Sequence, residues 1–100
     1  MKHIITVLFL LAALGISPSS YASGCSLTKS LYDAGKFKQA FKTAQTYSRY
    51  NDSCADFYLG LMYLNGEGVK SNTSKGNDYI QKAAKNGYQP AIDYLNNMAP

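Results

Sequence analysis

The chain has 100 residues, of which 46% are hydrophobic and 16% charged, and its ten Lys and Arg outnumber its six Asp and Glu. A chain of this length forms one domain at most. Its only histidine is His3 and its only glutamate is Glu67, so it offers neither a triad with a histidine base nor the usual four Cys and His ligands of structural zinc. We therefore expect no enzyme, no metal and no cofactor.

The first 22 residues have the layout of a secretory signal peptide. Lys2 provides a positive start, and the apolar run 4–16 that follows is well short of the roughly 20 residues that a membrane-spanning helix needs. Ser20 and Ala22 are the small residues expected before a cleavage after position 22. We expect a periplasmic or secreted protein without a membrane span, whose mature chain is residues 23–100.

The mature chain contains two cysteines, Cys25 and Cys54. Export brings them to a compartment where disulfides persist, and two cysteines permit a single pairing. The expected bridge closes a loop of about thirty residues, which stabilises the fold by roughly 3 to 4 kcal/mol. The alternative is a lipid anchor on Cys25, although lipid-attachment sites usually carry Leu three residues before the cysteine, where this chain has Ala22.

Apolar residues recur at helical spacing in five stretches, and no run alternates in the manner of a strand, so we predict an all-α domain. The first two helices run from about 25 to 33 and from about 37 to 49. The third begins after a polar turn, where Asp52 or Ser53 can cap it, and is apolar nearly all round until it ends at Asn65.

Two shorter helical stretches complete the chain. Polar residues at 71–74 offer caps for a fourth helix, which ends at Asn86, and Pro90 opens a short fifth helix. The order of helix, glycine turn and helix thus appears at 25–50 and again at 54–87. Helix pairs that repeat after thirty-odd residues are typical of an α-solenoid, so we predict two helix pairs and a C-terminal helix.

The second helix pair resembles one complete Sel-1-like repeat, a relative of the tetratricopeptide repeat. Gly76 and Tyr79 stand where that family usually has Ala and Trp. The resemblance implies a loosely conforming repeat at 25–50, the Sel-1-like repeat at 54–90 and a truncated third unit at 91–100. The residues that carry it are Ala55, Leu59, Gly60, Tyr63, Gly66, Gly68, Val69, Lys75, Lys82, Ala83, Ala84, Gly87 and Ala91.

The resemblance implies a scaffold that binds proteins on the concave face formed by the first helix of each pair. Aligning the repeats places an apolar centre with a charged rim on that face, which is the usual anatomy of a protein interface. It also places the two cysteines near the starts of neighbouring first helices. The alternative is that the apolar members pack the small core or lie under the C-terminal helix. The predicted binding residues are Lys29, Tyr32, Phe57, Leu61, Leu64 and Asp93.

Together these features indicate an exported, non-enzymatic module that binds another envelope or secreted protein. Two narrower versions are an immunity or inhibitor protein that neutralises a toxin or cell-wall enzyme, and a lipidated envelope adaptor. The lysines are scattered along the mature chain, and no recognised nucleic-acid motif surrounds them, so we expect a protein partner and no nucleic acid.

Overall fold

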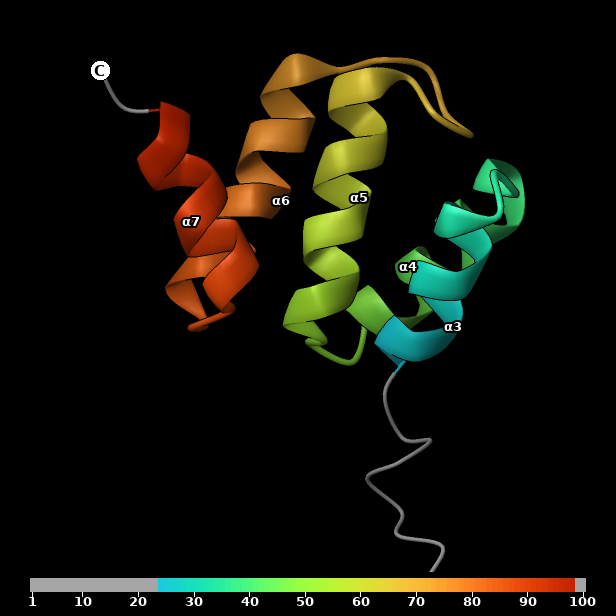
Figure 1. Ribbon diagram of the computed structural model, residues 1–100, viewed down its shortest axis with the longest axis horizontal. Coiled ribbons are helices and arrows are strands. Elements are labelled where there is room, and N and C mark those ends of the chain that lie inside the picture. The colour runs from blue at the N-terminus through green and yellow to red at the C-terminus, as the bar shows by residue number, and fades with distance from the viewer. Residues whose placement is uncertain (1–23, 99–100) are drawn as a thin grey trace, which may run out of the picture.

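The computed structural model describes residues 24–98, and every regular element in this range is a helix (Figure 1). The predicted signal peptide, residues 1–22, lies outside the described residues. The predicted all-α fold and its five helices are confirmed. The helices are α3 (Gly24–Asp33), α4 (Phe37–Ser48), α5 (Ser53–Asn65), α6 (Thr73–Lys85) and α7 (Gln89–Met98).

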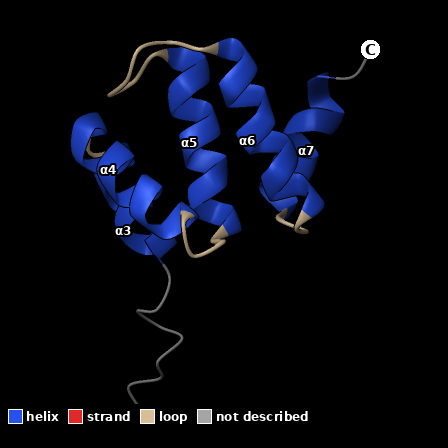
Figure 2. Cartoon of the chain, turned by 180° about the vertical axis from the view of Figure 1, so that it is seen from behind, coloured by secondary structure: helices blue, strands red, loops and turns tan. Residues whose placement is uncertain are grey.

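Consecutive helices pack against one another as a short solenoid. α3 pairs with α4 and α5 pairs with α6, while α7 lies against α6. α5 contacts both helices of the first pair as well as α6. α3, α5 and α7 lie toward the viewer in Figure 1, and Figure 2 shows the side on which α4 and α6 lie. No helix within residues 24–98 is long and apolar enough to cross a membrane.

The helix boundaries follow from local capping. The carboxylate of Asp52 accepts hydrogen bonds from the backbone N–H groups of Cys54, at 3.0 Å, and Ala55, at 3.2 Å, so Asp52 rather than Ser53 caps α5. Gly66 ends α5 in the left-handed conformation. The side chain of Asn72 accepts from the backbone N–H of Lys75 at 3.0 Å and caps α6.

The core consists of two clusters that share α5. One cluster joins α5 to α3 and α4, and its fully buried members are Ala40, Ala44, Ala55, Leu59 and Met62. The other joins α5 to α6 and α7, and its fully buried members are Ile80, Ala83 and Ala91. Because opposite sides of α5 serve different clusters, this helix is apolar nearly all round.

Two glycines allow α5 and α6 to approach closely. A Cβ atom on Gly60 would lie 2.6 Å from Cδ1 of Ile80, and one on Gly76 would lie 2.7 Å from Cγ of Leu64. Helix propensity alone makes Gly76 a weakness of about 1 kcal/mol. Its missing side chain gives Leu64 the space that it occupies against α6.

The loop between α5 and α6 rests on the first helix pair. Gly68 has φ +72°, and a Cβ atom there would lie 2.5 Å from the carbonyl oxygen of Phe37 at the start of α4. Gly35 has a similar φ of +76° but open space around it. Both glycines therefore adopt a left-handed backbone conformation, and only at Gly68 is there also no space for a side chain.

We expect Gly35→Ala to lower the free energy of unfolding by about 1 kcal/mol, the cost of a left-handed alanine. Gly68→Ala has the same cost and in addition a backbone clash, so it should lose about 2 to 4 kcal/mol. Urea unfolding followed by circular dichroism measures both. Equal losses for the two variants would contradict the packing of this loop on α4.

Candidate binding face

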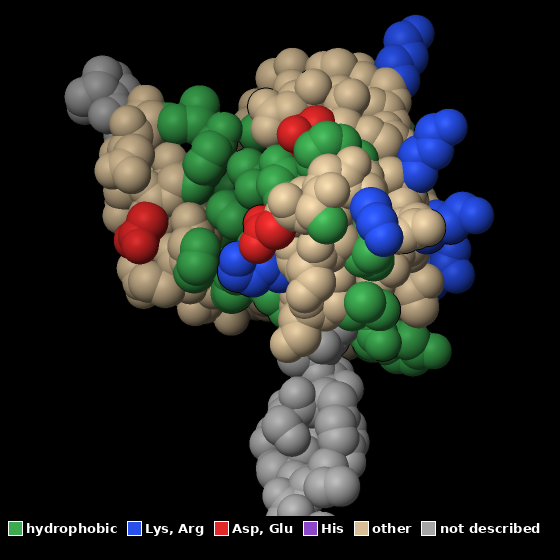
Figure 3. Space-filling model, turned by 45° about the vertical axis from the view of Figure 1, so that its right-hand side comes forward, with side chains coloured by type: hydrophobic (Ala, Val, Ile, Leu, Met, Phe, Trp, Pro, Cys, Tyr) green, Lys and Arg blue, Asp and Glu red, His purple; other side chains and the backbone are tan. Residues whose placement is uncertain are grey.

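Aromatic side chains form a row across α3, α5 and α7. Tyr32 of α3 lies 5.2 Å from Tyr58 of α5, and Tyr58 lies 5.7 Å from Phe57, as measured between ring centroids. Phe57 in turn lies 6.4 Å from Tyr94 of α7. We call the surface that carries this row the α3–α5–α7 face. Figure 3 shows apolar side chains gathered in the middle of the molecule on this side, between α3 and α7.

The apolar residues predicted for partner binding are half-buried. Phe57, Leu61 and Leu64 pack against the cluster that α5 forms with α6 and α7, and Tyr32 packs against the cluster with α3 and α4. Each keeps part of its surface exposed. They therefore serve the core and line the α3–α5–α7 face at the same time, and Tyr32 meets the others through Tyr58.

The charged residues predicted for the rim already have partners within the chain. The ammonium of Lys29 lies 2.7 Å from the carboxylate of Asp33, and both side chains are more than half exposed. Asp93 accepts a hydrogen bond from the side-chain amide of Gln89 at 2.8 Å. Exposed pairs of this kind contribute little to stability, so the rim can exchange these contacts for contacts with a partner.

A hydrogen bond ties the C-terminal end of α3 to the loop that follows α5. The hydroxyl of Tyr32 donates to the carboxylate of Glu67 at 2.6 Å, and the amide of Asn65 donates to the same oxygen at 3.2 Å. Burial, followed by the bond to Glu67, raises the pKa of Tyr32 to about 12. The contact holds the Tyr32 ring in the aromatic row.

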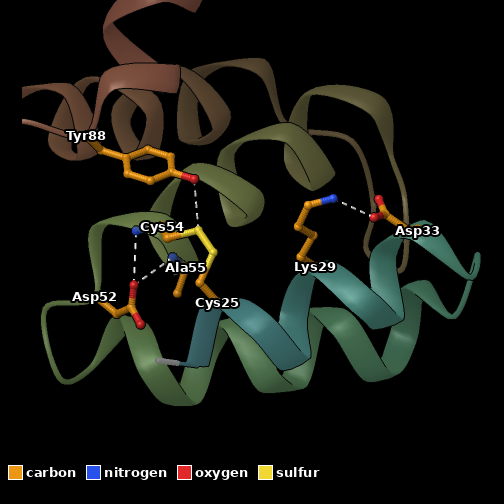
Figure 4. The surroundings of a disulfide bond; sticks show 7 residues. All are labelled: Cys25, Lys29, Asp33, Asp52, Cys54, Ala55 and Tyr88. Carbon is orange, nitrogen blue, oxygen red and sulfur yellow. Dashed lines mark hydrogen bonds and ion pairs between the residues drawn. A yellow bond between two sulfur atoms is a disulfide. The ribbon is translucent and has the colours of Figure 1, made fainter. Parts of the chain in front are cut away.

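The predicted disulfide joins Cys25 to Cys54 at the opposite end of α3 (Figure 4). The two Cα atoms lie 5.5 Å apart, within the usual range for a bridge. The hydroxyl of Tyr88 lies 2.9 Å from the Cys54 sulfur, and because that sulfur has no proton in a disulfide, Tyr88 is the donor. Lipid attachment would need the Cys25 sulfur, which the bridge already uses.

Sequence reasoning missed three tyrosines of this region. Tyr58 and Tyr94 link the aromatic row, and Tyr88 covers the disulfide and lies 5.5 Å from Phe57. Burial raises the pKa of Tyr58 and of Tyr88. Tyr58 follows the predicted binding residue Phe57, and Tyr94 follows the predicted binding residue Asp93. Their position next to these residues in the sequence was the feature that could have indicated them.

The helices divide the charges between two sides of the molecule. α3, α5 and α7 carry one lysine and three aspartates, whereas α4 and α6 carry five lysines and one aspartate. Most Lys and Arg side chains in Figure 3 accordingly lie along one edge, away from the apolar middle. Asp56 is buried, so the exposed charges of α3, α5 and α7 are Lys29, Asp33 and Asp93. The α3–α5–α7 face is therefore apolar with a net charge of one negative unit, although the chain as a whole is basic.

Ser26 and Lys29 stand at the Ser-x-x-Lys spacing of certain acylating enzymes. In that chemistry the lysine acts as a base and must lose its proton. Here the hydrogen bond to Asp33 raises the pKa of Lys29 and keeps it protonated. Both side chains are exposed on α3, so the Ser-x-x-Lys spacing occurs here without a pocket that would activate the serine as a nucleophile. Residues 24–98 also contain no group of three or more His, Cys, Asp or Glu side chains that could hold a metal ion.

Stacked helix pairs with an apolar strip along their first helices define a scaffold of the α-solenoid class. Residues 55–88 match the Sel1 repeat family, and the match spans α5, α6 and the turn that leads to α7. The resemblance predicted from the sequence is thus confirmed for this helix pair. No curated protein and no solved structure matches the chain.

Replacing both cysteines by alanine should lower the free energy of unfolding by about 3 to 4 kcal/mol, because the unfolded chain regains the freedom of a closed loop of about thirty residues. Urea unfolding with and without a phosphine reductant measures the effect. Reductant should destabilise the wild type by a similar amount and leave the double variant unchanged. A wild type that is equally stable in both conditions would contradict a stabilising bridge.

The raised pKa of Tyr32 predicts a loss of stability at alkaline pH. The unfolded phenol ionises near its ordinary pKa of 10.0, whereas the folded one keeps its proton to about 12. The contribution of Tyr32 is therefore complete below pH 10 and is lost as the pH rises from 10 to about 12. Carbon-13 NMR of labelled tyrosine, assigned with Tyr32→Phe, should show this late titration.

Glu67→Gln provides the matched control for Tyr32. It removes the negative charge while keeping a side chain of the same shape, so the pKa of Tyr32 should fall. Burial, the larger cause, persists and should keep that pKa above its ordinary value. If Tyr32 titrates like free tyrosine in the wild type, the contact with Glu67 is not formed in solution.

Proposed function

We propose that this protein is an exported, non-enzymatic interaction module that binds another envelope or secreted protein on its α3–α5–α7 face. Sel1 repeats typically mediate protein interactions, and residues 55–88 form such a repeat. The observation that carries the choice of face is the aromatic row from Tyr32 through Tyr58 and Phe57 to Tyr94. Half-exposed aromatic side chains on a fixed scaffold are typical anchors of protein interfaces.

The charge of the face indicates the chemistry of the partner. Lys29 is paired with Asp33, while Asp93 and Glu67 carry the remaining charges near the aromatic row. A partner segment with an apolar centre and neutral or basic flanks fits this pattern, because like charges across an interface disfavour binding. An acidic partner segment does not fit it.

The face is also held rigid before any partner arrives. The disulfide fixes one end of α3 against α5, and the bond from Tyr32 to Glu67 fixes the other end. A preorganised surface loses less conformational entropy on binding than a mobile one. The immunity or inhibitor role is the form of this proposal in which the partner is a toxin or enzyme that the bound module inactivates.

Site-specific photocrosslinking in the native exporting cell tests the proposal. A photoreactive amino acid replaces Lys29 or Asp93, which are exposed at the rim, and matched variants carry it at Gln39 of α4 or Gln81 of α6, which are exposed elsewhere. We expect the two rim positions to capture the same protein and the two control positions not to capture it. The captured partner should then bind purified Leu61→Ala at least several-fold more weakly than wild type.

Crosslinks that form only from Gln39 or Gln81 would overturn the choice of face. Capture of the same protein by all four positions would show adhesion without a defined face. Crosslinks to a cytoplasmic protein by the uncleaved chain would overturn the export part of the proposal. Inhibition of the captured enzyme by the wild type and not by Leu61→Ala would select the immunity or inhibitor form.

A further inference from the structure

On the side away from the α3–α5–α7 face, residues of α4, α5 and α6 line an open cavity of about 380 Å³. Figure 2 shows this side of the helices. Its volume lies in the range of pockets that hold small organic ligands. Nearly all of its lining side chains carry a hydrogen-bond donor. They are Gln45, Ser48, Arg49, Leu59, Tyr79 and Lys82.

Two cations meet in this cavity from different helix pairs. Arg49 lies just after α4, and among the described residues its guanidinium has no ion pair. Lys82 comes from α6, and its ammonium lies 3.6 Å from the carboxylate of Asp56. In the described part of the chain, the only acid that pairs with either cation is thus Asp56, a buried residue of α5.

Asp56 is fully buried, so it holds Lys82 without occupying the cavity. The hydroxyl of Ser48 donates to one oxygen of the carboxylate, while the other oxygen faces Lys82 and has no hydrogen bond. Asp56 therefore compensates one of the two cations. The cavity keeps a net charge of one positive unit.

We propose that this cavity is a second binding site and that it takes a ligand with a single carboxylate group. The planar guanidinium of Arg49 suits a carboxylate because two parallel N–H groups can donate to its two oxygens. The ammonium of Lys82 and the hydroxyl of Tyr79 provide further donors. Within residues 24–98 no carboxylate pairs with Arg49.

The uncharged part of the ligand contacts the ring of Tyr79, which is half-buried. The ring of Tyr79 stacks on Tyr63 at 5.8 Å with an angle of 3° between the planes, and the ring of Phe41 meets Tyr63 edge-on at 5.4 Å. The ammonium of Lys75 lies 5.3 Å above the Tyr63 ring. These contacts fix the wall of the cavity before a ligand binds.

Charge distinguishes a carboxylate from a phosphate group. A phosphate monoester carries close to two negative charges at neutral pH, and the buried carboxylate of Asp56 lies directly behind Lys82. One net positive charge compensates one carboxylate and leaves a phosphate uncompensated. The site therefore favours a single negative charge, from either a small organic acid or a glutamate side chain of a peptide.

Amide and side-chain NMR titration of the mature protein tests this site with four defined probes. Benzoate and its neutral analogue benzamide represent small acids. The capped peptide Ser-Gly-Glu-Gly-Ser and its Gln counterpart represent a protein source. We expect benzoate or the Glu peptide to shift the Arg49 and Lys82 signals saturably, and the neutral analogues to leave them in place. Whichever acid binds more tightly identifies the source.

Arg49→Gln should weaken that binding about tenfold, the effect expected when a charge-assisted contact is lost. Arg49→Lys should recover part of the affinity, because it restores the charge without the planar fork. Lys85→Gln is the matched control, since it removes one exposed cation from α6 outside the cavity and should change nothing. Urea unfolding of each variant verifies that the fold is intact.

Equal shifts by the acid and its neutral analogue, or equal weakening by Lys85→Gln and Arg49→Gln, would overturn the site. Inorganic phosphate is a fifth probe, and tighter binding of phosphate than of either acid would overturn the selectivity of the site for a single negative charge. In the photocrosslinking of the α3–α5–α7 face, capture is expected at Lys29 and Asp93, and no crosslinking position lines the cavity. Failure of one proposal is therefore distinguishable from failure of the other.

Discussion

The burial of α5 on nearly all sides is the constraint on which the rest of the structure depends. α5 has only thirteen residues, yet it contributes side chains to both core clusters. Leu59 and Met62 pack toward the first helix pair, whereas Phe57 and Leu61 pack toward α6 and α7. A helix of this length can do so only if its neighbours approach closely, which the facing Gly60 and Gly76 permit. The same arrangement leaves the outer edge of Phe57 and Leu61 exposed, so the candidate binding face is a direct consequence of how the core is shared.

The small core explains why α3 is held in place by a contact at each of its ends. Five of the eight fully buried residues of the two clusters are alanines, which bury little apolar surface, and small domains rarely gain more than about 3 to 5 kcal/mol from the core alone. α3 itself buries the Thr28 hydroxyl without a hydrogen-bond partner, which weakens its packing. The disulfide at one end of α3 and the Tyr32–Glu67 hydrogen bond at the other end compensate for the unfavourable burial of Thr28 in the middle of the helix. Both the disulfide and this hydrogen bond also position the aromatic row.

Local chemistry made the fold predictable from the sequence, whereas the sites depend on contacts between distant residues. Helical periodicity, the Asp52 cap and the terminal glycines predicted five helices, and the cysteine count predicted the bridge. The aromatic row was only partly predictable, because Tyr58 lies on a side of α5 whose exposure depends on how far α3 covers it. The lysines are scattered along the chain, and only the alternation of helices gathers them on α4 and α6. Arg49 and Lys82 line one cavity from different helix pairs, which residue spacing within one pair cannot reveal.

The two candidate sites lie on different sides of the same part of α5. Asp56 and Phe57 are adjacent, and successive side chains of a helix point about 100° apart, so the carboxylate reaches the α4 and α6 side while the ring joins the α3–α5–α7 face. The carboxylate is already held by Ser48 and Lys82, and the ring is already held by Tyr58, Tyr88 and Tyr94. Neither residue has to move for the other site to be occupied. The backbone of α5 is fixed by both clusters, so the free energies of binding on the two sides should add rather than couple.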